Sequence, residues 1–184
     1  MLSPIRTVLI HYPLRSFFTI LIMICMSIYS YKKIKIRYVD GNITKRKGII
    51  FWLLINYVMA LLFFTVIGRR SWEYYRYNLE FGYSYCDVFL KGDQNLLTQI
   101  IANIAVFIPI GFLGSFLFRK STYIKCMLCG VMLSVSIEFL QFVLKRGCCE
   151  FDDIISNSLG IIIGCVVVMI LKKISGRKKE KNVF

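Results

Sequence analysis

The sequence predicts an all-α integral membrane protein, a bundle of about five transmembrane helices. Hydrophobic residues make up 57% of the 184 residues and charged residues 18%, whereas soluble domains have roughly 45–50% and 25%. The apolar residues are clustered, since residues 49–67 and 154–171 contain no charged side chain. Each run is long enough for a helix to cross about 30 Å of hydrocarbon. Such clustering excludes intrinsic disorder, collagen and a small disulfide scaffold.

The first two predicted spans cover residues 16–31, with an alternative start at Pro13, and residues 49–67. The first span is short, so we expect its flanking side chains to snorkel to the interface. Arg6 and Arg15 before it resemble the basic region of a signal peptide. No small-residue cleavage site follows, so the segment is predicted to be a retained anchor.

The other three predicted spans cover residues 96–118, 122–144 and 154–171. Helices are favoured over strands because lipid leaves backbone amides no water to bind. Pro109 lies in the first of these spans and can kink it. We expect three regions: two N-terminal spans with a basic loop (1–67), a domain with an aromatic loop and three spans (68–171), and a basic tail that contacts anionic lipid (172–184).

The basic residues predict which ends of the spans face the cytoplasm. A net charge of +14 would suggest nucleic acid in a soluble protein. Here 16 of the 24 Lys and Arg residues lie in segments 32–47, 119–125 and 172–184, which share one side of the membrane. By the positive-inside rule that side is cytoplasmic. We therefore predict an outer N-terminus, a cytoplasmic C-terminus, a multi-pass protein of the cell membrane, and no nucleic-acid partner.

The outer loop, residues 68–95, carries more aromatic residues than a solvated linker needs. Two interpretations stay open: a belt at the level of the lipid headgroups, or a platform that stacks on a sugar or another ring. The aromatic residues are Trp72, Tyr74, Tyr75, Tyr77, Phe81, Tyr83, Tyr85 and Phe89.

Polar residues within the spans predict a site. A charged residue at a helix centre costs about 2.5 to 3.5 kcal/mol on insertion scales, so Glu138 should face the bundle interior or a wet cavity. Gln141 shares its helix face. In the predicted topology these two, with Asn103 and Asn157, fall in the outer half of the bilayer. The prediction is an outer-leaflet polar pocket, with Arg146, Asp152 and Asp153 at its entrance. Interhelical hydrogen bonds without a ligand are the alternative.

Small residues recur at intervals of four in the last three spans. Ser156, Gly160 and Gly164 form one such stripe. Cys126, Gly130 and Ser134 form a second, and Gly111 and Ser115 belong to a third. Because small side chains let helix backbones approach closely, these faces are predicted to pack against each other.

Together these motifs resemble the VanZ-like family of bacterial membrane proteins. The family pattern appears here as Asn103, Phe107, Pro109 and Gly111; as Glu138 and Gln141; as residues 150–153; and as Asn157, Gly160 and Gly164. Residues 78–81 are similar to a further family element but lack its proline. Two departures matter: position 147, where the family usually has Arg, is Gly and follows Arg146, and a Cys148–Cys149 pair occupies a turn that is usually apolar.

The resemblance implies a role at the bacterial envelope, and it connects the chain with resistance to the glycopeptide antibiotic teicoplanin. The expected partners are membrane lipids and a lipid-linked cell-wall precursor or lipoglycopeptide. A non-enzymatic role is favoured. A membrane enzyme that modifies a lipid or cell-wall precursor, with Glu138 and Asp153 as proton-transfer groups, is the alternative, and a purely structural scaffold is the third.

Other chemistry has weak support in the sequence. Cys126 and Cys129 form one Cys-x-x-Cys motif, but without a second pair, and with His11 as the single histidine, no metal site is predicted. No nucleotide-binding loop or nucleophile elbow is present, so no cofactor is predicted. A disulfide from Cys86 to Cys148 or Cys149 is compatible with the predicted topology.

Overall fold

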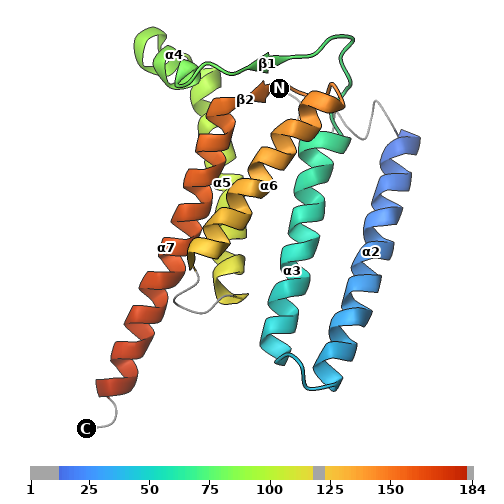
Figure 1. Ribbon diagram of the computed structural model, residues 1–184, viewed down its shortest axis with the longest axis vertical. Helices are drawn as coiled ribbons and strands as arrows, with labels where there is room; N and C mark the ends of the chain where they lie inside the picture. Colours follow the sequence, from blue (N-terminus) through green and yellow to red (C-terminus); the bar gives the residue numbers. More distant parts are fainter. Residues whose placement is uncertain (1–12, 118–122, 182–184) are drawn as a thin grey trace. The chain divides into compact units, whose positions relative to one another are not determined.

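The computed structural model describes residues 13–117 and 123–181 (Figure 1). Arg6, His11, residues 118–122 and residues 182–184, on which parts of the predictions rest, lie outside the described residues. The chain divides into two compact units. The first unit comprises residues up to 81 and residues 135–151, and the second comprises residues 82–134 and residues from 152 onwards.

Among the described residues, five helices are long and apolar enough to cross a membrane, in agreement with the predicted number of spans. A shorter helix and two very short strands complete the described elements. These elements are α2 (Pro13–Val39), α3 (Lys45–Leu62) with its continuation η1 (Phe63–Ile67), β1 (Tyr77–Asn78), α4 (Tyr83–Lys91), α5 (Gln94–Leu117), α6 (Tyr123–Val143), β2 (Cys149–Glu150) and α7 (Phe151–Lys181).

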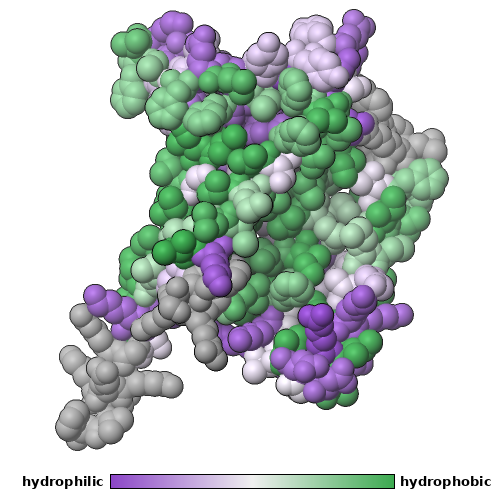
Figure 2. Space-filling view, viewed as in Figure 1, coloured by the Kyte–Doolittle hydropathy of each residue, from purple (hydrophilic) through white to green (hydrophobic). Residues whose placement is uncertain are grey.

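In the first unit, α2 and α3 form a helical hairpin (Figure 1). Thr44 caps α3 by accepting a hydrogen bond from the amide of Lys47, and the Trp52 indole donates to the Ser27 carbonyl at 3.2 Å. The sides of the hairpin are hydrophobic, while hydrophilic residues gather at its connecting turn (Figure 2). This distribution suits two membrane-spanning helices whose turn lies in water.

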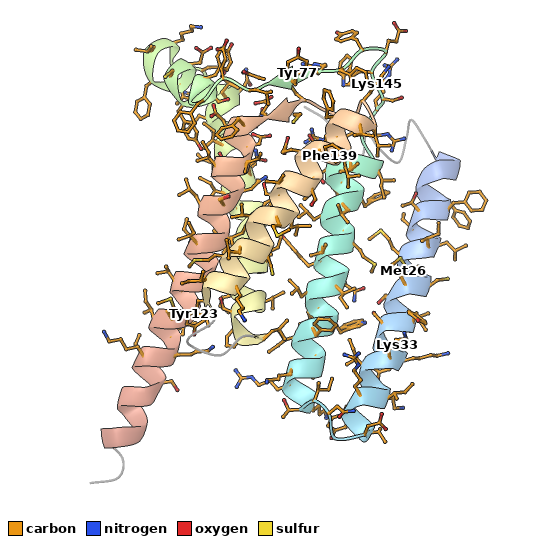
Figure 3. All side chains as sticks on the ribbon, viewed as in Figure 1. Met26, Lys33, Tyr77, Tyr123, Phe139 and Lys145 are labelled. Carbon is orange, nitrogen blue, oxygen red and sulfur yellow. The ribbon has the colours of Figure 1, made fainter. Side chains whose placement is uncertain are left out.

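The first span differs from its prediction at its C-terminal end. Helix α2 continues from Tyr31 to Val39, so most of the basic segment expected to be a loop is helical. Lys and Arg are good helix formers, and hydropathy marks where lipid ends rather than where the helix ends. Lys33 lies in this helical extension (Figure 3), and its ammonium is 5.0 Å from the centroid of the Tyr29 ring, a cation–π contact.

In the second unit, α5 and α7 pack through glycines. A Cβ atom on Gly160 would overlap the carbonyl oxygen of Ile104, and one on Gly164 would overlap that of Ile108. Gly111 meets the Ile161 backbone in the same way. The predicted small-residue packing is confirmed here, because only a residue without a side chain allows this approach.

Lys172, predicted to begin a solvated tail, instead lies on α7 and caps the end of α5. Its ammonium donates to the Ser115 carbonyl at 3.1 Å and to the Tyr123 hydroxyl at 3.2 Å (Figure 3). It also lies 5.3 Å from the centroids of the Phe116 and Tyr123 rings. The last carbonyls of a helix lack partners within the helix, and cations near them are favourable.

Candidate functional site

The seven predicted site residues fall into two groups, one in each unit. The first unit contains Glu138, Gln141 and Arg146, and the second contains Asn103, Asp152, Asp153 and Asn157. The structure brings residues together within each group. The convergence of Glu138, Gln141, Asn103 and Asn157 into one pocket stays a prediction.

Gln141 and Arg146 hold the end of the second span. The last turn of that span is a π-helix, η1, in which the Gly68 amide bonds the Phe63 carbonyl. Its terminal carbonyls therefore need partners from outside the helix. The Gln141 side chain donates to the Thr65 carbonyl at 3.3 Å, and the Arg146 guanidinium donates to the Ile67 carbonyl at 3.0 Å. Both side chains thus cap a helix that lies more than 70 residues earlier in the chain.

Glu138 is almost fully buried, with 3% of its surface exposed. Its carboxylate accepts a hydrogen bond from the Glu150 amide at 3.1 Å. Glu150 belongs to β2, which pairs in parallel with β1 through Tyr77–Cys149 and Asn78–Glu150. Glu138 therefore ties α6 to the strand that leads into α7.

The turn after α6 explains the departure at position 147. Lys145 and Gly147 both have positive φ angles, 53° and 98°, and the second favours glycine. A Cβ atom on Gly147 would lie 2.6 Å from the Arg69 guanidinium and 3.0 Å from the Gln141 amide oxygen. Sequence reasoning missed Arg69, whose guanidinium occupies the space beside Gln141 into which a side chain at position 147 would extend.

An exposed surface of aromatic and basic side chains lies beside this turn, and we call it the aromatic surface. Tyr75 and Tyr77 contact the Phe142 ring, with centroids 4.9 and 6.0 Å apart. The Lys145 ammonium lies 4.6 Å from the Tyr75 centroid and donates to the Glu73 carbonyl (Figure 3). The remaining members are Trp72, Tyr74 and Arg76, whose guanidinium lies 4.6 Å from the Trp72 centroid. This geometry is compatible with both the headgroup belt and the stacking platform.

In the second unit, hydrogen bonds join α5 to α7. The Gln99 amide donates to the Asp153 carboxylate at 3.4 Å, and the Cys165 thiol donates to the Gly111 carbonyl at 3.6 Å. Both pairs are 54 residues apart. Asn103 and Asn157 are also 54 residues apart and lie one helical turn after Gln99 and Asp153. We call these four residues, Gln99 and Asn103 of α5 with Asp153 and Asn157 of α7, the polar ladder.

The two asparagines of the polar ladder each carry a buried atom that lacks a hydrogen-bond partner among the described residues. The Asn157 amide nitrogen donates to the Ser134 hydroxyl at 2.9 Å, but its oxygen accepts no hydrogen bond. The amide nitrogen of Asn103 donates none. This part of the unit therefore offers a donor on α5 and an acceptor on α7.

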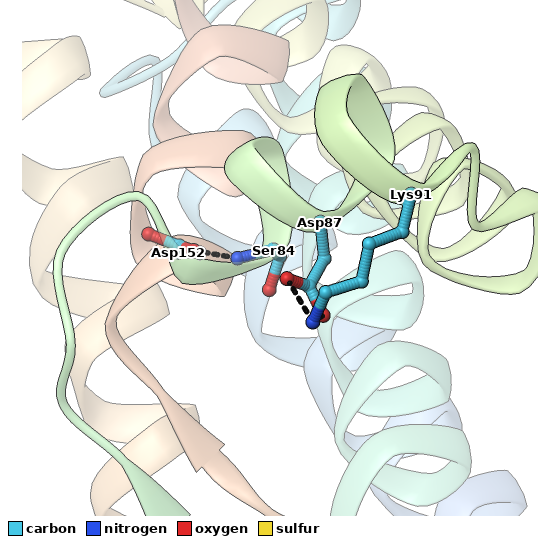
Figure 4. Close-up of polar contacts among 4 residues, drawn as sticks. All are labelled: Ser84, Asp87, Lys91 and Asp152. Carbon is cyan, nitrogen blue, oxygen red and sulfur yellow. Dashed lines mark hydrogen bonds and ion pairs between the residues drawn. The ribbon is translucent and has the colours of Figure 1, made fainter.

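Asp152 is 2% exposed, and both of its carboxylate oxygens accept hydrogen bonds from backbone amides. The donors are Gly82, the N-cap residue of α4, and Ser84 in its first turn, each at 2.7 Å; Figure 4 shows the bond from Ser84. A carboxylate at a helix N-terminus satisfies its free amides and complements its dipole. Sequence reasoning placed Asp152 at a pocket entrance, whereas these bonds give it the role of a helix cap.

The cysteines and acidic residues of the described part of the chain offer little further chemistry. No cluster of three or more His, Cys, Asp and Glu residues there could hold a metal ion. Cys86 is exposed and its thiol is free, and its pairing with Cys148 or Cys149, which belong to the other unit, stays a prediction. The thiols of Cys126 and Cys165 are buried and 3.8 Å apart, which is ordinary packing of small apolar side chains.

Comparison with known proteins supports the resemblance drawn from the motifs. The model of the family described as VanZ/LLP1 matches residues 16–172, most of the chain. An 86-residue stretch is 27% identical to Protein VanZ of Enterococcus faecium and covers 47% of this chain. The same stretch covers 53% of that protein, so the chain spans about half the length of this relative. No solved structure matches the chain.

Proposed function

Since this chain belongs to the VanZ/LLP1 family, we propose that it is a multi-pass protein of the bacterial cell membrane that binds a lipid-linked or lipophilic molecule. The ligand is a lipid-linked cell-wall precursor or a lipoglycopeptide of the teicoplanin type. Binding such a molecule would contribute to glycopeptide resistance. The proposed activity is binding rather than catalysis.

One observation carries this proposal: the two asparagines of the polar ladder have buried amide atoms without a hydrogen-bond partner among the described residues. A buried polar group without a partner costs about 1–3 kcal/mol, and in a native protein it calls for an explanation such as a water or a ligand. The Asn103 donor and the Asn157 acceptor match a hydroxyl or an amide, which accepts and donates at once. Lipid-linked saccharides and glycopeptides carry many such groups.

The other predicted site residues also have roles in the proposal. In the first unit the Gln141 amide oxygen is also buried without a hydrogen-bond partner among the described residues, so Gln141 can accept from a ligand while its nitrogen holds the Thr65 carbonyl. Glu138 and Arg146 support the turn around it. In the second unit Asp153, bound to Gln99, adds a carboxylate one helical turn before the two asparagines, and Asp152 positions α4.

A structural scaffold is the second candidate, and the capping bonds favour it. Gln141, Arg146, Glu138 and Asp152 all bind backbone groups. In a scaffold the polar residues would serve to make these hydrogen bonds and would bind no ligand. The two candidates differ at the polar ladder, where a scaffold requires no third molecule.

Mass spectrometry of the protein purified from its membranes in mild detergent tests the proposal. We expect a polar lipid or glycolipid to copurify with the wild-type protein and to be lost from Asn157→Ala. Ser158→Ala is the matched control, because the neighbouring Ser158 hydroxyl bonds only its own helix, at the Ile154 carbonyl. A wild-type protein that carries no such molecule, or equal amounts in both variants, would favour the scaffold.

A further inference from the structure

Helix α4 is held to its own unit along one side. Its first-turn amides bind the Asp152 carboxylate (Figure 4). One residue further along, the Tyr85 hydroxyl lies 2.8 Å from the Ser156 hydroxyl. Because Ser156 also donates to the Asp152 carbonyl, α4 is fixed to the first turn of α7 by a connected set of hydrogen bonds.

The opposite side of α4 is apolar and exposed. Tyr83, Cys86, Phe89 and Leu90 follow one another at helical spacing, and we call them the α4 stripe. The Phe89 side chain is 86% exposed and that of Leu90 is 82% exposed. Neighbouring exposed apolar side chains of this size usually mark a surface that contacts lipid or another protein.

The chain places this stripe at the edge of the membrane. Gly92, with φ of 68°, ends α4, and α5 begins at Gln94. Since consecutive Cα atoms are about 3.8 Å apart, the Cα atoms of Lys91 and Gln94 are separated by at most about 11 Å. Helix α5 is one of the membrane spans. The α4 stripe therefore lies close to the level at which that span enters the lipid.

The polar groups of α4 lie off the stripe. Lys91 and Asp87 form an ion pair at 2.9 Å (Figure 4). The hydrogen bond and the attraction to Asp87 raise the pKa of Lys91 above its ordinary value. One edge of the helix is thus charged while the stripe is apolar, the arrangement of a helix that lies at a membrane surface.

We propose that α4 is an interfacial membrane anchor whose stripe enters the boundary between headgroups and acyl chains. A bilayer fits this face better than a protein does. The stripe contains no charged side chain that would pair with a protein partner, and the neighbouring span α5 also exposes apolar side chains, such as Ile101 at 57%. Tyr83 adds a side chain with an apolar body and a polar tip, which suits an interface.

The anchor has a consequence for the rest of the unit. Asp152 joins α4 to the beginning of α7, directly before Asp153 of the polar ladder. The depth of α4 in the interface therefore sets the depth of the ladder. This inference does not depend on the proposed ligand.

Photocrosslinking of the full-length protein in its native membranes tests the anchor. A photoreactive benzoylphenylalanine replaces Phe89, Leu90 or, as the matched control, Lys91, which is exposed on the same helix but off the stripe. After irradiation, adducts are identified by intact-protein mass and by gel mobility. Using both Phe89 and Leu90 guards against a single variant that fails to fold.

We expect phospholipid adducts at positions 89 and 90 at several times the yield found at position 91. Crosslinks at positions 89 and 90 to a second copy or to another protein would overturn the anchor. Equal lipid yields at all three positions would overturn it as well.

Discussion

At the scale of single residues, the buried polar side chains bind backbone groups of distant segments. Glu138 binds an amide beyond the end of α6, Gln141 binds a carbonyl of η1, and Asp152 binds the amides that begin α4. The sequence identified these residues because buried polar groups in a span are costly. It could not identify their partners, since backbone amides and carbonyls have no sequence signature.

Asp152→Asn should loosen α4. An amide side chain offers one acceptor oxygen in place of two and carries no charge to complement the helix dipole, and hydrogen bonds to a charged group contribute about 1.5–3 kcal/mol. Hydrogen exchange at the amides of residues 82–91 should accelerate about tenfold or more. Asp153→Asn is the control, because the described bond of Asp153 leads to Gln99 rather than to α4. Equal acceleration in the two variants would contradict the capping role.

Gly147→Ala should destabilise the turn after α6. Its φ of 98° suits glycine and costs another residue about 1–3 kcal/mol. The added Cβ would also meet the Arg69 guanidinium. Adding Arg69→Ala removes the guanidinium, so the double variant should regain the stability lost to the steric contact. It should not regain the stability lost to the backbone angle. Thermal unfolding of the three variants would show this partial rescue, and an unchanged midpoint in Gly147→Ala would contradict the assigned backbone geometry.

At the scale of elements, hydropathy predicted the existence of the five spans but not their ends. It missed the helical extension of α2, whose basic residues are good helix formers outside lipid. Helix α4 was missed because nine residues of mixed polarity carry little periodic signal, and its N-terminus depends on Asp152, 68 residues away from Ser84. The π-helix η1 and the β1–β2 pair likewise depend on contacts made in three dimensions.

Gly160→Ala should separate α5 from α7, because even one methyl group would overlap the Ile104 carbonyl. Overpacking of this kind costs about 1–3 kcal/mol. The midpoint of thermal unfolding in detergent should fall by several degrees. Leu159→Ala, which alters a 41% exposed neighbour, should change it much less. A Gly160→Ala protein as stable as the wild type would mean that the two helices do not pack through this glycine.

At the scale of the whole molecule, the five candidate spans among the described residues predict that residues before the first span and residues after the last lie on opposite sides of the membrane. The distribution of basic residues predicts that the N-terminus is the outer one. Cysteine labelling of intact cells with an impermeant reagent should reach a reporter at Asp93 and miss one at Lys173. If the reagent reached Lys173 and missed Asp93, the predicted orientation would be wrong, and the polar ladder would not lie in the outer leaflet.

The central claim is that Asn103 and Asn157 together hold one polar group of a lipophilic ligand, and a double-mutant cycle tests it most directly. Teicoplanin affinity is measured in nanodiscs for the wild type, Asn103→Ala, Asn157→Ala and the double variant. If the two asparagines bind the same group, each single substitution should weaken teicoplanin affinity about tenfold. The double variant should bind little worse than either single variant, which corresponds to a coupling energy of about 1 kcal/mol between the two positions. Single effects that add to within about 0.5 kcal/mol would contradict the claim, and absence of teicoplanin binding would exclude the lipoglycopeptide as the ligand.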